Sequence, residues 1–336
     1  MPKNNSESKK LNLGIELLRF FLCFWVVIFH CSNFKKQHSK YIWRAFHVPT
    51  FFVISFYFFY PILFKKMIDK NISRFHRLLI PYLLWPILLL IMDNFMKKIF
   101  LGHIDMKVSL KKLFLQILFG DGIHGVFWFH FSLIFISLLF SINAFLLKNH
   151  FLYVLQILGL ICLYLLFSEF NYKFFNLTSF KSSLGTIVEL MPLAVIGCIY
   201  SSFNLLALAT KTHVFYKFIL FIFIIFLFEY DIFILPKGFR YPNVILFILA
   251  STILILFFGS LYFSINIIYS IIRIITKYTG GIYYIHFIIR NYLQRYVLLF
   301  KKRTYFSASL IYFISYGICF LGSSLFRNQK LEYLFL

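Results

Sequence analysis

The first apolar run of the chain contains three side chains that could act together in chemistry, Glu16, Arg19 and His30. Arg19 and His30 are about three helical turns apart, so both project from one face of a helix, about 16 Å apart along its axis. Glu16 lies one turn before Arg19 and can pair with its guanidinium. One face of this predicted helix therefore presents a fixed cation and, further along, an imidazole that titrates near neutral pH.

Further basic and titratable groups lie in or beside later apolar runs. Arg74 and Arg77 are in a basic stretch that we expect to be a loop before the third run. His286 lies inside a late run, where an imidazole needs a partner, either in a site or as a backbone carbonyl of the core. Arg290 and Arg295, in the same run, could face a cavity or extend to the headgroups, and the sequence does not separate these two alternatives.

The composition decides the kind of solvent that these groups are in. The chain has 336 residues, of which 61% are hydrophobic, 22% aromatic and 13% charged, and its mean hydropathy is +0.83. Soluble domains contain about a quarter charged residues. Each membrane-spanning helix needs roughly 20 apolar residues. The sequence therefore predicts an all-α, polytopic transmembrane helical bundle of about ten spans, and it excludes soluble, coiled-coil, disulfide-scaffold and nucleic-acid-binding classes.

The spans follow from apolar runs bounded by charges and turn residues. We expect one integral-membrane domain over 1–336, with a short cytoplasmic tail at 1–10. Two segments with basic residues at helical spacing, 107–119 and 260–277, are predicted to lie in the membrane interface. The predicted spans are 12–31, 47–64, 78–95, 126–147, 151–168, 184–203, 215–235, 243–259, 280–300 and 306–325.

Several sequence signals are uninformative about orientation or cofactors. With an internal N-terminus, fifteen basic residues fall on the inner side and sixteen on the outer side, so the positive-inside rule does not fix the topology. The five cysteines are scattered through apolar runs and are interpreted as packing residues. The sequence has neither a P-loop nor a GxGxxG motif, and we expect no metal site.

The arrangement Glu16-x-x-Arg19-x10-His30 resembles the opening span of the acyltransferase-3 family, bacterial integral-membrane acyltransferases that modify surface glycans. One position departs from that pattern, because the family usually has glycine where this chain has Phe56. We expect the phenylalanine ring to fill space beside the site. Four further blocks resemble the family in the same order, and they cover 47–55, 74–81, 126–129 and 282–286.

The resemblance implies a bacterial inner-membrane enzyme with both termini cytoplasmic. The donor would be acyl-CoA, most often acetyl-CoA, and the acceptor a hydroxyl of a cell-surface polysaccharide or its lipid-linked precursor. His30 fits the base that takes the hydroxyl proton, with Glu16 and His286 as further catalytic candidates. Arg19, also a catalytic candidate, fits a contact to the phosphates of the donor, together with Arg74 and Arg77.

Two alternatives remain open at this stage. The same fold could transfer a longer acyl group, such as succinyl, or could acylate an amine. A glycan transporter or flippase is the alternative from another class, because charged residues inside a helical bundle also line transport paths. A transporter has no reason to bind acyl-CoA, so donor binding discriminates between the two classes.

Overall fold

The structure is a computed structural model that describes residues 12–31, 47–65, 67–102, 110–120, 127–147, 150–167, 179–229, 244–261, 266–301 and 304–325. The predicted tail 1–10 lies outside these residues. In the described part of the chain the regular secondary structure is helical, and strands are absent. This confirms the prediction of an all-α fold.

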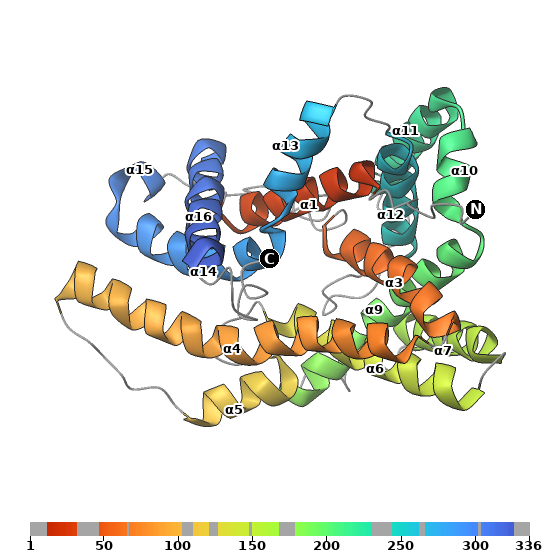
Figure 1. Cartoon of the computed structure of the whole chain (residues 1–336), viewed down its shortest axis with the longest axis horizontal. Coiled ribbons are helices and arrows are strands. Elements are labelled where there is room, and N and C mark those ends of the chain that lie inside the picture. Colours follow the sequence, from red (N-terminus) through yellow and green to blue (C-terminus); the bar gives the residue numbers. More distant parts are fainter. Residues whose placement is uncertain are drawn as a thin grey trace, which may run out of the picture.

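The helices follow one another along the chain as Figure 1 shows. They are α1 (Leu13–Cys31), α3 (Val48–Phe64), α4 (Ile68–Leu101), α5 (Leu110–Phe119), α6 (Phe127–Leu147), α7 (Phe151–Phe167), α9 (Ser179–Ser202), α10 (Leu205–Lys211), α11 (Val214–Glu229), α12 (Val244–Gly259), α13 (Asn266–Thr276), α14 (Thr279–Tyr296), α15 (Leu298–Lys301) and α16 (Tyr305–Leu325).

Each predicted apolar segment falls on a helix where the structure describes it, and residues 230–235 of the seventh segment lie outside the described residues. Two segments differ most in extent from the prediction. Helix α4 begins at Ile68, well before the predicted start at 78, because the polar stretch 68–77 contains no proline or glycine to interrupt it. The ninth segment is divided, since α14 ends where Val297 adopts extended backbone and α15 follows. Helix α10, which precedes α11, was not predicted as a separate element.

Five described helices are long and apolar enough to cross a membrane, namely α1, α4, α6, α9 and α16. The pair α10 and α11, which is bent by 113°, makes a sixth if it is one span. Helices α3, α7 and α12 are apolar but shorter. The chain is therefore an integral membrane protein with a helical bundle, and the count of about ten spans stays a prediction.

The outer surface of the bundle is apolar, as a lipid solvent requires. Helix α11 exposes one aromatic side chain after another, including Phe215, Phe218 and Phe223, each of them more than half exposed. In water such a surface would drive association. In a bilayer the same side chains face hydrocarbon, which explains why the chain has so many phenylalanines.

Most buried side chains of the described residues fall into two large clusters, and α1 connects them. The first half of α1 packs into a cluster built mainly by α3, α6, α9 and α12. Its second half packs into a cluster built by α4, α14 and α16. In Figure 1, α4 and α6 run together along one side of the molecule, and α1, α14 and α16 lie on the other side. The C-terminal end of α1 is therefore positioned by α14 and its neighbours.

Candidate functional site

The start of α1 is fixed by a side-chain cap and a close backbone approach. Asn12 accepts a hydrogen bond from the Ile15 N–H at 3.1 Å, which satisfies one of the free donors at the helix start. A Cβ atom added to Gly14 would lie 1.8 Å from the Phe258 carbonyl oxygen, so only glycine permits this contact between α1 and α12. The helix face that carries the candidate residues is thereby held in place.

The predicted pair between Glu16 and Arg19 is present. Nη1 of Arg19 lies 3.1 Å and 3.2 Å from the two carboxylate oxygens of Glu16. The Arg19 side chain is 40% exposed, and that of Glu16 is 17% exposed. The guanidinium is therefore oriented by the carboxylate while part of it stays accessible to a ligand.

The stripe of α1 that carries Arg19 and His30 faces α14. Cys23, one turn after Arg19, lies 3.3 Å by its Sγ atom from the Thr279 carbonyl oxygen. The centroid of the His30 ring is 5.5 Å from that of His286, and the ring planes are inclined by 32°. Two histidines that are far apart in the sequence, each a catalytic candidate, are therefore neighbours in the fold.

His286 is fully buried, and its backbone contact defines its tautomer. Nδ1 lies 3.0 Å from the Ile282 carbonyl oxygen one turn earlier. A carbonyl only accepts, so Nδ1 carries a proton, and in the neutral form of the ring Nε2 presents a lone pair. Nε2 is buried and has no hydrogen-bond partner among the described residues. His286 therefore holds a buried ring nitrogen without a hydrogen-bond partner among the described residues, and its ring lies beside that of His30.

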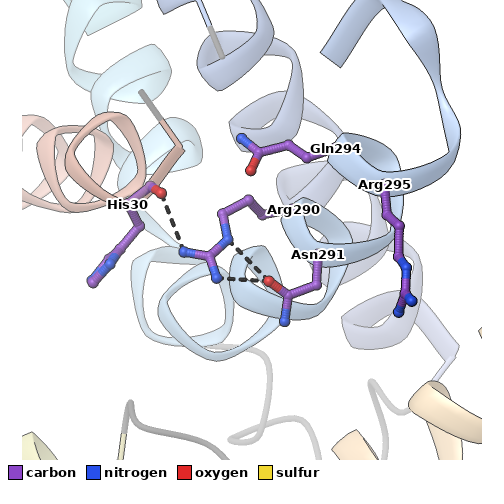
Figure 2. A pocket seen from close by; sticks show the side chains of 5 residues that line it. All are labelled: His30, Arg290, Asn291, Gln294 and Arg295. Atoms are coloured by element: carbon purple, nitrogen blue, oxygen red, sulfur yellow. Dashed lines mark hydrogen bonds between the residues drawn. The ribbon is translucent and has the colours of Figure 1, made fainter. Parts of the chain in front are cut away.

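A pocket of about 380 Å³ opens where α1 ends against α14, lined by His30, Arg290, Asn291, Gln294 and Arg295 (Figure 2). Arg290 donates through Nη1 to the His30 carbonyl oxygen at 3.1 Å, and Gln294 donates to the Cys31 carbonyl oxygen at 2.8 Å. The last carbonyls of a helix lack partners within it and attract cations. Helix α14 thus caps α1 and fixes the backbone of His30.

Both arginines whose orientation the sequence left open, Arg290 and Arg295, contribute to this pocket. Asn291 and Gln294 were not predicted as site residues. Their signal was present, because they lie within one turn of these arginines at positions that are neighbours on a helix surface. Asn291 accepts from Nε and Nη2 of Arg290 at 3.1 Å and 2.6 Å, which holds the guanidinium in one orientation.

Aromatic rings connect the histidine pair to α3 and α6. The Phe129 ring on α6 lies 5.2 Å from Phe52 and 5.4 Å from Tyr283, between ring centroids. Tyr283 is 6.2 Å from His286 by the same measure. Residues from four of the sequence blocks singled out above therefore meet in one continuous cluster around His30 and His286.

The prediction that Arg74 and Arg77 lie in a loop is wrong. Both lie in the first turns of α4, because this helix begins at Ile68. Arg74 turns into the bundle, where Nη2 donates to Ser55 Oγ at 2.8 Å and lies 3.4 Å from Ser137 Oγ. Its Nε is buried without a hydrogen-bond partner in the described part of the chain. Arg77 is exposed, with Nε 3.4 Å from the Ser73 carbonyl oxygen.

Contacts of α14 show that α1, α4 and α14 run in the same direction. Along α4, Trp85 stacks on Tyr284 at 5.3 Å between centroids, and Asp93 accepts from the Tyr292 hydroxyl at 2.6 Å. Along α1, Cys23 meets the start of α14 and His30 meets its middle. The ends of α1 and α4 therefore lie on the pocket side.

The three candidate donor contacts are divided between α1 and α4. Arg19 and Arg74 lie in the early parts of their helices, away from the pocket side, and Arg19 is about 16 Å from His30 along α1. Among the described residues no hydrogen bond or ion pair joins Arg19 to Arg74 or Arg77. The structure thus brings together the histidines and places the arginines apart from them.

Phe56, which replaces the usual glycine of the resemblance, is fully buried beside Arg74. Its ring packs against Phe140 at 5.0 Å, and the Arg74 guanidinium carbon is 5.8 Å from its centroid. A Cβ at Gly197 would lie 2.4 Å from the Val53 carbonyl oxygen and 3.0 Å from Phe56 Cβ. In this contact between α3 and α9 the small residue is therefore Gly197 on α9. Phe56 on α3 fills space near Arg74 instead of near His30.

The chain matches the model of the acyltransferase domain of the acyltransferase-3 family over residues 12–327. No curated protein and no solved structure matches the chain. The matched region contains every candidate residue described above.

Proposed function

Because the chain belongs to the acyltransferase-3 family, and is therefore a membrane acyltransferase, we propose that it transfers an acetyl group from acetyl-CoA to a hydroxyl of a cell-surface polysaccharide or its lipid-linked precursor. The observation that carries the proposal is the contact of His30 with buried His286 at the edge of a pocket. Imidazole is the side chain best suited to take up a hydroxyl proton near neutral pH.

In the proposed reaction His30 is the base, because it also lines the pocket that would receive the acceptor. The acceptor oxygen forms a bond to the thioester carbonyl carbon while His30 takes the hydroxyl proton. The carbon–sulfur bond then breaks, and the proton passes to the leaving thiolate, which gives free CoA. His286 acts through His30 as a positioning residue, since its Nε2 lone pair can share the proton that His30 takes up.

The donor contacts are proposed for Arg19, Arg74 and Arg77. Support comes from the Arg74 guanidinium, which two serine hydroxyls orient while its Nε has no hydrogen-bond partner among the described residues. Arg19 is similarly oriented by Glu16 and remains partly accessible. An arginine fork suits phosphate oxygens. We propose that this end of the bundle is cytoplasmic, with both termini on that side, in the bacterial inner membrane.

The test uses the full-length chain purified into lipid nanodiscs. Free thiol release from acetyl-CoA is measured, with succinyl-CoA in parallel, and acetylation of surface polysaccharide is measured in cells that express the same variants. His30→Ala should lower the rate by about 10²–10⁴, the usual contribution of a base. The control is His213→Ala, an exposed histidine at the bend between α10 and α11.

Two outcomes would reject the proposal. Equal rates for the His30 and His213 variants would remove His30 as the base. Glycan movement across the membrane without any binding or consumption of acyl-CoA would favour a transporter.

A further inference from the structure

We propose that the pocket between α1 and α14 binds the acyl acceptor and selects acceptors that carry a negative charge close to the acylated hydroxyl. This inference rests on the proposed function and names the substrate class of the same site. The anion could be a phosphate, as in a phosphodiester glycan or a lipid-linked precursor, or the carboxylate of an acidic sugar.

The position of the pocket makes it suitable for the acceptor. His30 belongs both to the pocket lining and to the histidine pair, so a molecule in the pocket lies beside the proposed base. The volume of about 380 Å³ is at the lower end of the range for small-molecule pockets. Arg19 and Arg74 lie toward the opposite ends of their helices, which leaves this pocket for the second substrate.

The lining has the chemistry of an anion site. It contains two guanidinium groups, two side-chain amides and one imidazole, and none of the described lining residues is acidic. Asp93, the acid that contacts α14, accepts from the Tyr292 hydroxyl and pairs with Lys97 at 3.0 Å. Guanidinium groups bind carboxylates and phosphates through paired hydrogen bonds, which a neutral sugar cannot reproduce.

The two arginines have different surroundings, which assigns them different tasks. Arg290 is bonded to the His30 carbonyl and to Asn291, and its guanidinium carbon lies 4.0 Å from the Phe287 ring centroid. Arg295 is exposed, lies 5.6 Å from the Tyr296 ring centroid, and has no ion pair among the described residues. Arg290 orients the end of α1 through the contacts drawn in Figure 2. The exposed Arg295 is assigned the charge that meets the ligand.

Binding of three small probes to the full-length chain tests this assignment. Glucose 1-phosphate, glucuronate and methyl glucoside are titrated into protein in phosphatidylcholine nanodiscs, and binding is measured by saturation-transfer NMR. Both anions should bind about tenfold or more tightly than methyl glucoside, as a charge-assisted hydrogen bond provides. Tighter binding of glucose 1-phosphate assigns the anion as phosphate, and tighter binding of glucuronate assigns it as carboxylate.

Variants of the exposed arginine locate the effect. Arg295→Gln should remove the preference for anions, and Arg295→Lys should keep part of it, because the charge remains while the fork is lost. Arg273→Gln is the matched control, an exposed arginine on α13 outside the pocket, and should bind all three probes as the unaltered chain does. Raising salt should weaken binding of the anions more than that of methyl glucoside.

The inference fails if methyl glucoside binds as tightly as the anions, or if Arg295→Gln binds them unchanged. It also fails if CoA displaces the probes, which would make the pocket a donor site. Loss of probe binding in nanodiscs of anionic lipid would identify a lipid headgroup as the occupant and would likewise reject it. Thiol release from acetyl-CoA, measured on the same samples, reports on the proposed function independently of probe binding.

Discussion

Replacing His286 with asparagine separates its structural contact from its role in proton transfer. The imidazole is buried on α14, and its Nδ1 donates to the Ile282 carbonyl oxygen at 3.0 Å. The amide nitrogen of asparagine can occupy nearly the position of Nδ1 and donate the same hydrogen bond. What His286→Asn removes is the Nε2 lone pair beside His30. The fold should therefore survive while proton transfer is impaired.

The expected magnitudes follow from these contacts. Because the hydrogen bond to Ile282 is retained, the free energy of unfolding should fall by only about 1–2 kcal/mol, from the smaller side-chain volume. A complete general base contributes about 10²–10⁴ in rate. A residue that acts through His30 supplies part of that, so kcat should fall about 10- to 100-fold. The KM for acetyl-CoA should not change, since none of the proposed donor contacts lies on α14.

The assay is steady-state thiol release with varied acetyl-CoA, combined with thermal unfolding of the same nanodisc samples. Tyr284→Phe is the control, since it alters a buried ring on α14 and leaves both imidazoles intact. Unchanged kcat in His286→Asn would refute the proposed role of the Nε2 lone pair. A rise in KM with kcat preserved would instead show that α14 contacts the donor.

The remaining predictions concern the arginine fork, the contact between α4 and α14, and topology. Arg19→Lys keeps the charge but loses the planar guanidinium, of which Nη1 alone contacts both Glu16 oxygens, so acetyl-CoA affinity measured by titration calorimetry should fall about tenfold; unchanged affinity would reduce Arg19 to a headgroup contact. Tyr292→Phe removes the 2.6 Å hydrogen bond to Asp93 and should lower the free energy of unfolding of the bundle by about 0.6–2 kcal/mol. Thermal unfolding in detergent measures this change, and an unchanged midpoint would contradict it. In intact cells a membrane-impermeant thiol reagent should label a cysteine at Lys301 and not one at Lys65, both exposed positions; the reverse pattern would invert the proposed orientation.

Local patterns predicted the helices and the contacts within them. Apolar runs predicted every segment that became a long helix, and the one-turn spacing of Glu16 and Arg19 predicted their ion pair, because helix geometry alone determines both. The burial of all five cysteines agrees with their interpretation as packing residues. The early start of α4 was missed because its first turns are polar, and apolar periodicity does not detect a polar helical extension.

Contacts between distant segments could not be derived from periodicity. The family resemblance named His30 and His286 as candidates, but the spacing of residues does not indicate that their rings are neighbours. The capping of α1 by Arg290 and Gln294 was also missed, because it depends on where α14 crosses the end of α1. The contact of Arg74 with Ser55 was missed for the same reason, because it depends on how α4 packs against α3.

The cap that α14 places on α1 has a consequence for how the enzyme is made. His30 and Arg290 are separated by 260 positions, so α1 is synthesised long before its partner exists. Until α14 follows, the last carbonyls of α1 lack both Arg290 and Gln294, and His30 lacks the neighbouring imidazole. The proposed catalytic pair therefore forms only after α14 has been synthesised and packed against α1. A nascent or truncated chain, although already in the membrane, would hold no assembled site with which to consume acyl donor.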